Sequence, residues 1–284
     1  MMKISIHSRK LKPSVLLPKV LLYICLFFLA CIYIAPIAVM LLGSVKSAGE
    51  VLSFDLSLPK VWHWENYSHV FKCGKIGRGY LNSFLMTSIS TAVSIFFGAF
   101  TGIVLGRRTD RLARGLYYYF IFGLTITFQT ASTFYLMKEL NLYGTYTGVI
   151  LIFIAMRTPF TVMTFSSFVK GVPREIDEAA IMDGCSPLRM VFSVLLPIMK
   201  PILLTNLILT AITVWNNFMI PLFYLGKAKR WPVTLAIYNF FGQYNLDWHY
   251  VFAALTLAVL PMIILFLCLQ KYIVGGMTSG AVKG

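Results

Sequence analysis

The stretch PKVLLYICLFFLACIYIAPIAVMLL, Pro18 to Leu42, carries one charged residue and is the first of six long apolar segments in the chain. An α-helix needs about 20 apolar residues to cross the roughly 30 Å of hydrocarbon in a bilayer. The other five segments meet that requirement; they are Asn82–Leu105, Leu116–Leu136, Gly148–Val169, Pro201–Leu222 and Tyr250–Tyr272. The sequence therefore predicts an all-α, polytopic membrane protein with six transmembrane helices.

The composition agrees with a membrane protein. Of the 284 residues, 58% are hydrophobic and 12% are charged, and the mean hydropathy is +0.77. So little polar surface does not suffice to cover a water-soluble globule of this length. The segment at 18–42 is too long for the apolar region of a signal peptide and has no cleavage site of small residues before Ser44, so we expect it to remain as a helix.

Basic residues predict the orientation. They gather at 3–12, 107–114 and 170–200, and basic loops of this kind stay in the cytoplasm. The opposite loops carry a smaller number of lysines and arginines, so the bias is moderate. An even number of spans then places both termini in the cytoplasm, with tails at 1–17 and 274–284 flanking a membrane domain at 18–273.

Several classes of function are excluded by absent motifs. The net charge of +15 is scattered over membrane borders rather than gathered on a soluble domain, which argues for topology and lipid contact and against a nucleic-acid partner. The sequence has no phosphate-binding loop, no H-E-x-x-H or G-x-S-x-G motif and no metal-ligand spacing, so we expect neither catalytic nor metal-binding residues. The six segments contain no Asp or Glu, as an ion-coupled carrier would usually need.

The segment GVPREIDEAAIMDGCSP, residues 171–187, carries helix start and stop signals. Pro173 suits a first helical position, Gly184 suits a left-handed stop, and Ser186 suits the N-cap of a second helix. We therefore expect a helix, a sharp turn and another helix over about 171–200. By shape alone such a segment could also lie among lipid headgroups.

The residue pattern favours a more specific interpretation. Glu178-Ala179-Ala180, Gly184 after three further residues, then Val194 and Leu196-Pro197 closely resemble the EAA loop of membrane subunits of binding-protein-dependent ABC importers. In that family the loop docks into the nucleotide-binding subunit. The resemblance implies that the residues coupling this chain to an ATPase are Glu178, Ala179, Ala180, Asp183, Gly184 and Pro197.

The resemblance covers most of the chain and is nearest to the carbohydrate-uptake, maltose-transporter-type branch. It is carried by Trp64-Glu65-Asn66-Tyr67, by Tyr80-Leu81-Asn82-Ser83 and by the tail at 276–284. In relatives the tail inserts between the ATPase subunits, which implies contacts from Gly280, Lys283 and Gly284; a disordered tail is the alternative. The third span departs from the family pattern, with Thr127–Thr130 where relatives usually have a proline.

The resemblance also implies partners and a mechanism. These are a second homologous permease subunit, two ATP-binding subunits, an extracellular sugar-binding protein and membrane lipid, in a bacterial or archaeal cytoplasmic membrane. ATP and Mg would be bound by the partner subunits, and no cofactor by this chain. The chain would translocate a sugar by alternating access, with Trp64–Arg78 and Lys227–Trp231 as docking surfaces for the binding protein. Alternatives are a non-sugar solute, or an ATP-independent carrier or scaffold.

Polar and aromatic residues inside the membrane are candidates for the solute path. Amides bind hydroxyl groups and aromatic faces stack on sugar rings, although tryptophan also marks membrane interfaces. The candidates are Gln129, Arg157, Trp215, Asn216 and Asn217. Arg157 has a structural alternative, since Pro159 frees a carbonyl that a guanidinium could bind. Gly98, Gly102 and Gly106 predict close helix packing, against this chain or a partner.

Overall fold

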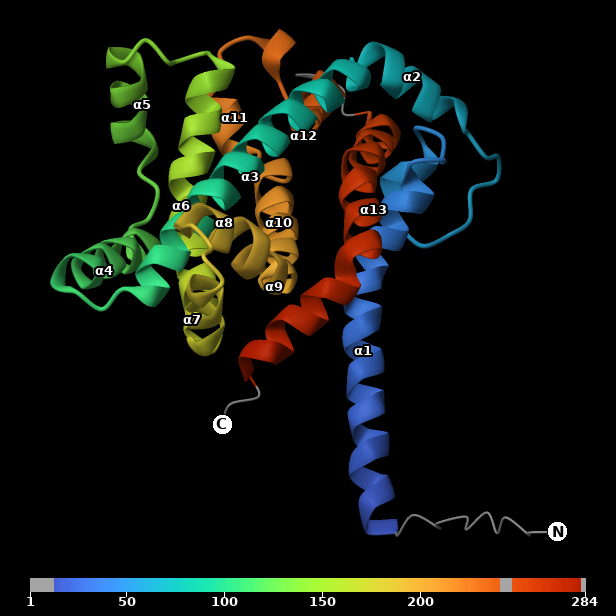
Figure 1. Ribbon diagram of the computed structural model, residues 1–284. Coiled ribbons are helices and arrows are strands. Elements are labelled where there is room, and N and C mark those ends of the chain that lie inside the picture. Colours follow the sequence, from blue (N-terminus) through green and yellow to red (C-terminus); the bar gives the residue numbers. More distant parts are fainter. Residues whose placement is uncertain (1–12, 241–246, 282–284) are drawn as a thin grey trace.

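The computed structural model describes residues 13–240 and 247–281, and all regular structure in those ranges is helical (Figure 1). Four helices are long and apolar enough to cross a membrane, and two bent helix pairs raise the number of candidate spans to six if each pair is one span. The four are α1 (Pro13–Gly43), α3 (Ile76–Arg107), α6 (Tyr146–Lys170) and α13 (Trp248–Ala281). The predicted all-α membrane fold is confirmed, with four to six candidate spans.

Helices α3 and α6 form the centre of the bundle, and the glycine stripe of α3 is what lets them approach. A Cβ atom on Gly102 would lie 2.6 Å from Cβ of Phe165 and 2.9 Å from the carbonyl oxygen of Val162. Thr161 Oγ1 of α6 also donates a hydrogen bond to the backbone oxygen of Ser94, at 3.1 Å. Small residues at a helix crossing permit this close packing. The stripe therefore faces a helix of this chain, a choice that the sequence left open.

The third predicted span, Leu116–Leu136, is broken in the structure. Helix α4 (Arg111–Thr125) and helix α5 (Thr130–Glu139) are bent by 114° with respect to each other. The break at 126–129 begins within a run of three β-branched residues, Thr125, Ile126 and Thr127, and such residues are poor helix formers. In Figure 1, α4 runs across the lower part of α6 whereas α5 lies near its upper part. The break needs no proline.

The fifth predicted span, Pro201–Leu222, is shorter than expected. Helix α10 (Lys200–Trp215) ends at the two asparagines, and Asn217 Oδ1 accepts a hydrogen bond from the backbone nitrogen of Ile220, at 2.9 Å, at the start of α11 (Met219–Tyr224). This side-chain acceptor satisfies a donor that the helix start leaves free. Before α10 come α8 (Pro187–Met190), a π-helical turn at Val191–Leu195 and α9 (Leu196–Ile198). Together these elements are bent by 77° with respect to α10.

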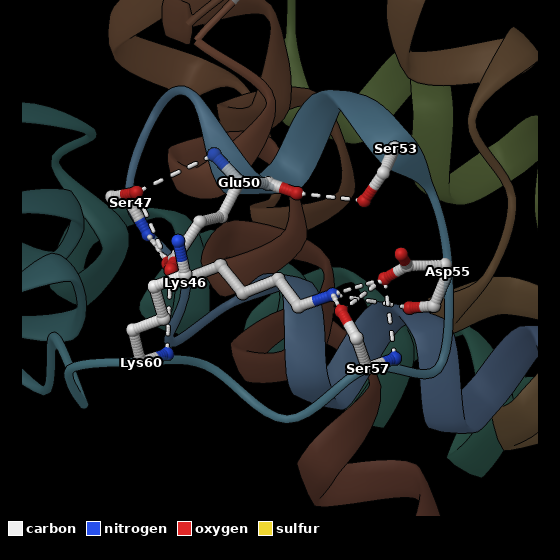
Figure 2. Close-up of polar contacts among 7 residues, drawn as sticks. All are labelled: Lys46, Ser47, Glu50, Ser53, Asp55, Ser57 and Lys60. Atoms are coloured by element: carbon white, nitrogen blue, oxygen red, sulfur yellow. Dashed lines mark hydrogen bonds and ion pairs between the residues drawn. The ribbon is translucent and has the colours of Figure 1, made fainter.

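A polar loop follows α1 and leads through η1 (Glu50–Ser53) to α2 (Glu65–Cys73). Figure 2 shows the Lys46 side chain crossing this loop, where its Nζ lies 2.7 Å from Asp55 Oδ1 and 3.1 Å from Ser57 Oγ. Lys46 is 2% exposed, so its charge is almost fully buried and these partners compensate it. Its ammonium group, followed by the Ser57 hydroxyl, lowers the pKa of the Asp55 carboxyl. The loop is thereby fixed as a small rigid unit.

Short helices close the upper end of the bundle. They are η3 (Ala228–Arg230), α12 (Val233–Ala236) and η4 (Ile237–Phe240). The start of α3 holds them through Asn82, whose Nδ2 donates to the backbone oxygens of Lys229 and Trp231 at 3.1 and 2.9 Å. Ser83 Oγ accepts from the backbone nitrogen of Val233 at 2.9 Å. These bonds tie segments about 150 residues apart in the chain.

Candidate coupling helix and solute cavity

The predicted helix, turn and helix form at 175–190. Helix α7 (Glu175–Met182) is followed by Gly184 at φ +76°, and Cys185 donates from its backbone nitrogen to the Ala180 oxygen at 3.0 Å. Ser186 Oγ accepts from the backbone nitrogen of Arg189, and Pro187 is the first residue of α8, as expected. Pro173 lies two residues before α7 rather than in its first turn. In Figure 1, α7 projects below the bundle at the end where α1 begins and α13 ends.

One face of this motif is both exposed and apolar. Met182 is 87% exposed, Leu188 66% and Ile181 61%, and all three lie near the exposed Glu178, Ala179, Asp183 and Gly184. Ala180 differs, because at 7% exposure it packs inward against its own chain. Of the two alanines expected to face a partner, only Ala179 is exposed in this structure. The three large apolar side chains were not singled out from the sequence, although they flank Gly184.

Arg107, the last residue of α3, holds α7 in place. Its Nε lies 2.7 Å from Asp177 Oδ2 and its Nη2 donates to Asp177 Oδ1 at 3.0 Å. Its Nη1 donates to the backbone oxygens of Val169 and Val172, at 3.1 and 2.9 Å, where α6 ends. The guanidinium thus joins the end of α3, the end of α6 and α7 through one ion pair and three hydrogen bonds. From the sequence, Arg107 counted only as an orientation signal.

The other predicted coupling residues lie as follows. Pro197 is exposed in α9, next to the 77° bend that precedes α10. Gly280 lies within α13, which continues as a helix to Ala281, so most of the predicted tail is helical. Lys283 and Gly284 lie outside the described residues. No group of three or more potential metal ligands occurs in the part of the chain that the structure describes.

A cavity of about 1020 Å³ lies between α4, α5 and α6, and it brings together two of the predicted path residues. Gln129, in the break between α4 and α5, and Arg157, on α6, both line it. Gln129 Nε2 donates to Thr127 Oγ1 at 3.1 Å. The aromatic side chains of the wall are Tyr119, Phe120, Phe122, Phe128 and Phe160. The break in the third predicted span is therefore what opens this space.

Arg157 is a cation without a counter-charge in this cavity. Its Nε is buried and has no hydrogen-bond partner, and its guanidinium carbon lies 4.7 Å from the centre of the Phe160 ring. The residues that line the cavity include no Asp or Glu. Within the described residues no hydrogen bond joins the guanidinium to a carbonyl near Pro159. The contact with Phe160 is a cation–π interaction, which compensates part of the charge.

The remaining path candidates lie elsewhere. Trp215 is 5% exposed in a core cluster, and its Nε1 donates to the backbone oxygen of Ala258 at 3.0 Å. Asn216 is exposed at the end of α10, and the Asn217 side chain accepts a hydrogen bond from the backbone nitrogen of Ile220 in α11. None of these three lines the cavity between α4, α5 and α6. In this conformation the indole of Trp215 acts in packing.

The two outer segments expected to dock a binding protein lie side by side. Gly74, Lys75 and Arg78 border the same small pocket as Ala228 and Trp231. The Asn82 bonds to Lys229 and Trp231 described above fix this arrangement. Segments far apart in the sequence therefore lie side by side at the end of the bundle opposite to α7 (Figure 1).

Comparison with known proteins gives consistent results. Residues 94–279 match the family model described as "binding-protein-dependent transport system inner membrane component". Over 90% of the chain, 31% of residues are identical to the melibiose/raffinose/stachyose import permease protein MelC of Bacillus subtilis, with 93% of that protein covered. The arabinooligosaccharides transport system permease protein AraQ of the same species is 33% identical over 91% of the chain and 94% of its own length.

The fold has a counterpart among solved structures. A chain of a bacterial ABC transporter involved in the import of the acidic polysaccharide alginate superposes with a TM-score of 0.83 at 20% identity. The match covers 93% of this chain and 99% of that one. The chain therefore shares its overall fold with a chain of that ABC transporter.

Proposed function

The chain belongs to the family of binding-protein-dependent transport system inner membrane components, and on that premise we propose that it forms the membrane path of an ABC importer for a sugar or oligosaccharide. It is a permease subunit, not an ATPase. The observation that carries the proposal is the match of nearly the whole chain to permeases whose names state sugar import. Import of sugars is thus the function these relatives support best.

The assembly we propose contains a second permease, two ATP-binding subunits that hold ATP and Mg, and an extracellular binding protein. The chain has six spans in a bacterial or archaeal cytoplasmic membrane, with both termini and α7 in the cytoplasm. This orientation is supported by the basic residues near α7 and by the position of α7 at the end of the bundle where α1 begins (Figure 1). We propose that α1 faces lipid or another subunit, because no residue of its most apolar stretch is buried by the rest of this chain.

Helix α7 is the proposed coupling element. Its exposed face combines Glu178 and Asp183 with large apolar side chains, and partner interfaces commonly combine such polar and apolar groups. Arg107 would transmit movement of α7 to α3, since it is the last residue of α3 and bonds to Asp177 of α7. Pro197, Gly280, Lys283 and Gly284 remain proposed as further ATPase contacts.

The proposed solute path is the cavity between α4, α5 and α6, lined by Gln129 and Arg157. In an alternating-access cycle, closure of the ATPase subunits would shift α7 and with it α3 and α6, which border or support this cavity. Asn216 and Asn217, at the joint between α10 and α11, are proposed as a hinge beside the path. The segments 64–78 and 227–231 are together the proposed docking site of the binding protein.

Reconstitution of the complex with its ATPase and binding protein tests this function. We expect the sugar-loaded binding protein to stimulate ATP hydrolysis and uptake of the sugar. Glu178→Ala should reduce stimulated hydrolysis severalfold, whereas Glu139→Ala, the same change at the end of α5, should not. Absence of stimulation by any sugar-loaded binding protein, in a complex that assembles, would contradict the proposal.

A further inference from the structure

The cavity between α4, α5 and α6 has an electrostatic character that points to a class of solute. We infer that it takes a sugar bearing a negative charge, a uronic acid or similar acidic sugar, and that Arg157 selects it by pairing with the carboxylate. This inference rests on the proposed function, since it assumes that solute passes through this cavity.

The first support is the unpaired charge. Arg157 lies eleven residues after Tyr146, or about 16 Å along α6 at roughly 1.5 Å per residue, and so near the middle of a helix of 25 residues. A charge at that depth is costly unless it is paired. Within the described residues its guanidinium has only the Phe160 ring beside it, and its Nε is buried without a hydrogen bond. An anionic group entering the cavity would supply the missing partner.

The second support is the rest of the lining. Hydroxyl and amide groups at Thr127, Gln129, Thr133 and Thr158 share the wall with five aromatic rings. Aromatic faces fit the apolar faces of sugar rings, and hydroxyls and amides fit the hydroxyls at their edges. A volume of about 1020 Å³ is at the upper end of the usual range for small-molecule sites and accommodates more than one sugar ring. One cation and no anion complete a lining suited to an acidic sugar.

The geometry of the guanidinium adds specificity. Its fork of N–H donors matches the two oxygens of a carboxylate, and a bond of this kind is stronger than a bond to a neutral hydroxyl. The guanidinium carbon lies 4.7 Å from the centre of the Phe160 ring, and the residues that line the cavity include no carboxylate to pair with it. A neutral sugar would leave this charge unpaired in the wall, so the site should discriminate against it.

Equilibrium binding to the purified complex, without its binding protein, tests the inference. The complex is placed in nanodiscs of phosphatidylcholine, which excludes anionic lipid headgroups as the partner of Arg157. The probes are radiolabelled digalacturonate and its neutral analogue, digalactose. We expect wild type to bind digalacturonate more tightly by about 10- to 100-fold, the range for a hydrogen bond to a charged group.

Three variants assign the effect. Arg157→Gln should abolish the preference, Arg157→Lys should keep part of it, and Lys138→Gln, which removes a cation outside the cavity lining, should bind as wild type does. Equal binding of the two probes, no binding of digalacturonate, or a preference that survives in Arg157→Gln would each overturn the inference. Loss of the second permease from the Arg157→Gln complex would assign the charge to a subunit contact and overturn it as well.

Failure of this inference is distinguishable from failure of the proposed function. Co-purification of the ATPase subunits and their hydrolysis of ATP are measured on the same preparations. A complex that assembles and hydrolyses ATP but shows no charge preference overturns the selectivity of Arg157 alone. A chain that does not associate with any ATPase contradicts the proposed function itself.

Discussion

Arg107 at the end of α3 and Asp177 in α7 form an ion pair, in which Nε lies 2.7 Å from Oδ2 and Nη2 donates a hydrogen bond to Oδ1 at 3.0 Å. Both side chains are about 15% exposed, so the pair is shielded from water and from salt. Because Arg107 also bonds the end of α6, the pair connects two long helices of the bundle to the short exposed helix. The position of α7 is therefore fixed by a side chain from a distant part of the sequence.

Arg107→Met should be more harmful than Asp177→Asn. Either change leaves one charge of a mostly buried pair without its partner, which costs about 3 kcal/mol or more of folding free energy. Arg107→Met also removes the bonds to Val169 and Val172. Thermal unfolding in detergent measures stability, and sugar-stimulated ATP hydrolysis measures coupling. Equal effects of the two variants would mean that the carbonyl bonds contribute nothing.

Gly102→Val should prevent normal packing of α3 on α6. The added side chain would clash with Phe165 and with the Val162 carbonyl oxygen. Overpacking of this kind usually lowers the free energy of unfolding by about 1–3 kcal/mol or more. Gly115→Ala in α4 is the matched control, since no atom lies within 4 Å of a Cβ there. It should raise stability slightly through helix propensity. Yield and melting temperature of the purified chain are the measurements.

Gly184 should tolerate Asn but not Val. No atom lies within 4 Å of a Cβ at this position, so the restriction is the positive φ of +76° and not space. Asn adopts this region more readily than a β-branched residue does, and the strain for Val is about 1–2 kcal/mol. Binding-protein-stimulated hydrolysis should stay near wild type in Gly184→Asn and fall in Gly184→Val. Normal activity in both would show that the turn geometry is not needed for coupling.

The loop after α1 should lose stability in acid. The pKa of Asp55 is below its ordinary value of 3.8, chiefly because Lys46 bonds to the carboxylate. A carboxyl with a lowered folded-state pKa contributes stability that is present above the unfolded-state pKa and is lost as pH falls through the folded-state pKa. Melting temperatures of wild type and Asp55→Asn should therefore differ at pH 6 and converge as pH falls below about 4. A difference that is constant across this range would contradict the role of the carboxylate.

Trp215→Phe should reduce stability and leave solute preference unchanged. The indole nitrogen donates to the Ala258 oxygen inside the core, and its loss leaves a buried carbonyl without that bond at a cost of about 1–3 kcal/mol. The ring does not line the cavity. Melting temperature and the relative uptake of two sugars by the reconstituted complex separate the two roles. A changed preference at normal stability would return Trp215 to the solute path.

The sequence alone determined the class of fold and the helix–turn–helix. Long apolar runs can only be helices in a bilayer, because every backbone group must be satisfied within the segment. Local signals such as Gly184 and Ser186 likewise act over a few residues, so they can be recognised without knowledge of the rest of the chain. The pattern from Glu178 to Pro197 carried the family resemblance for the same reason.

Only the tertiary structure decided which residues meet. The break after Thr125 opened a cavity where an unbroken span was expected, and three weak helix formers in a row do not signal that from hydropathy. Trp215 is buried against a helix 43 residues further along the chain, and Arg107 pairs with Asp177 70 residues away. The inward position of Ala180 depends on how the turn after α7 is oriented. Periodicity fixes which residues share a helix face, but packing decides what that face contacts.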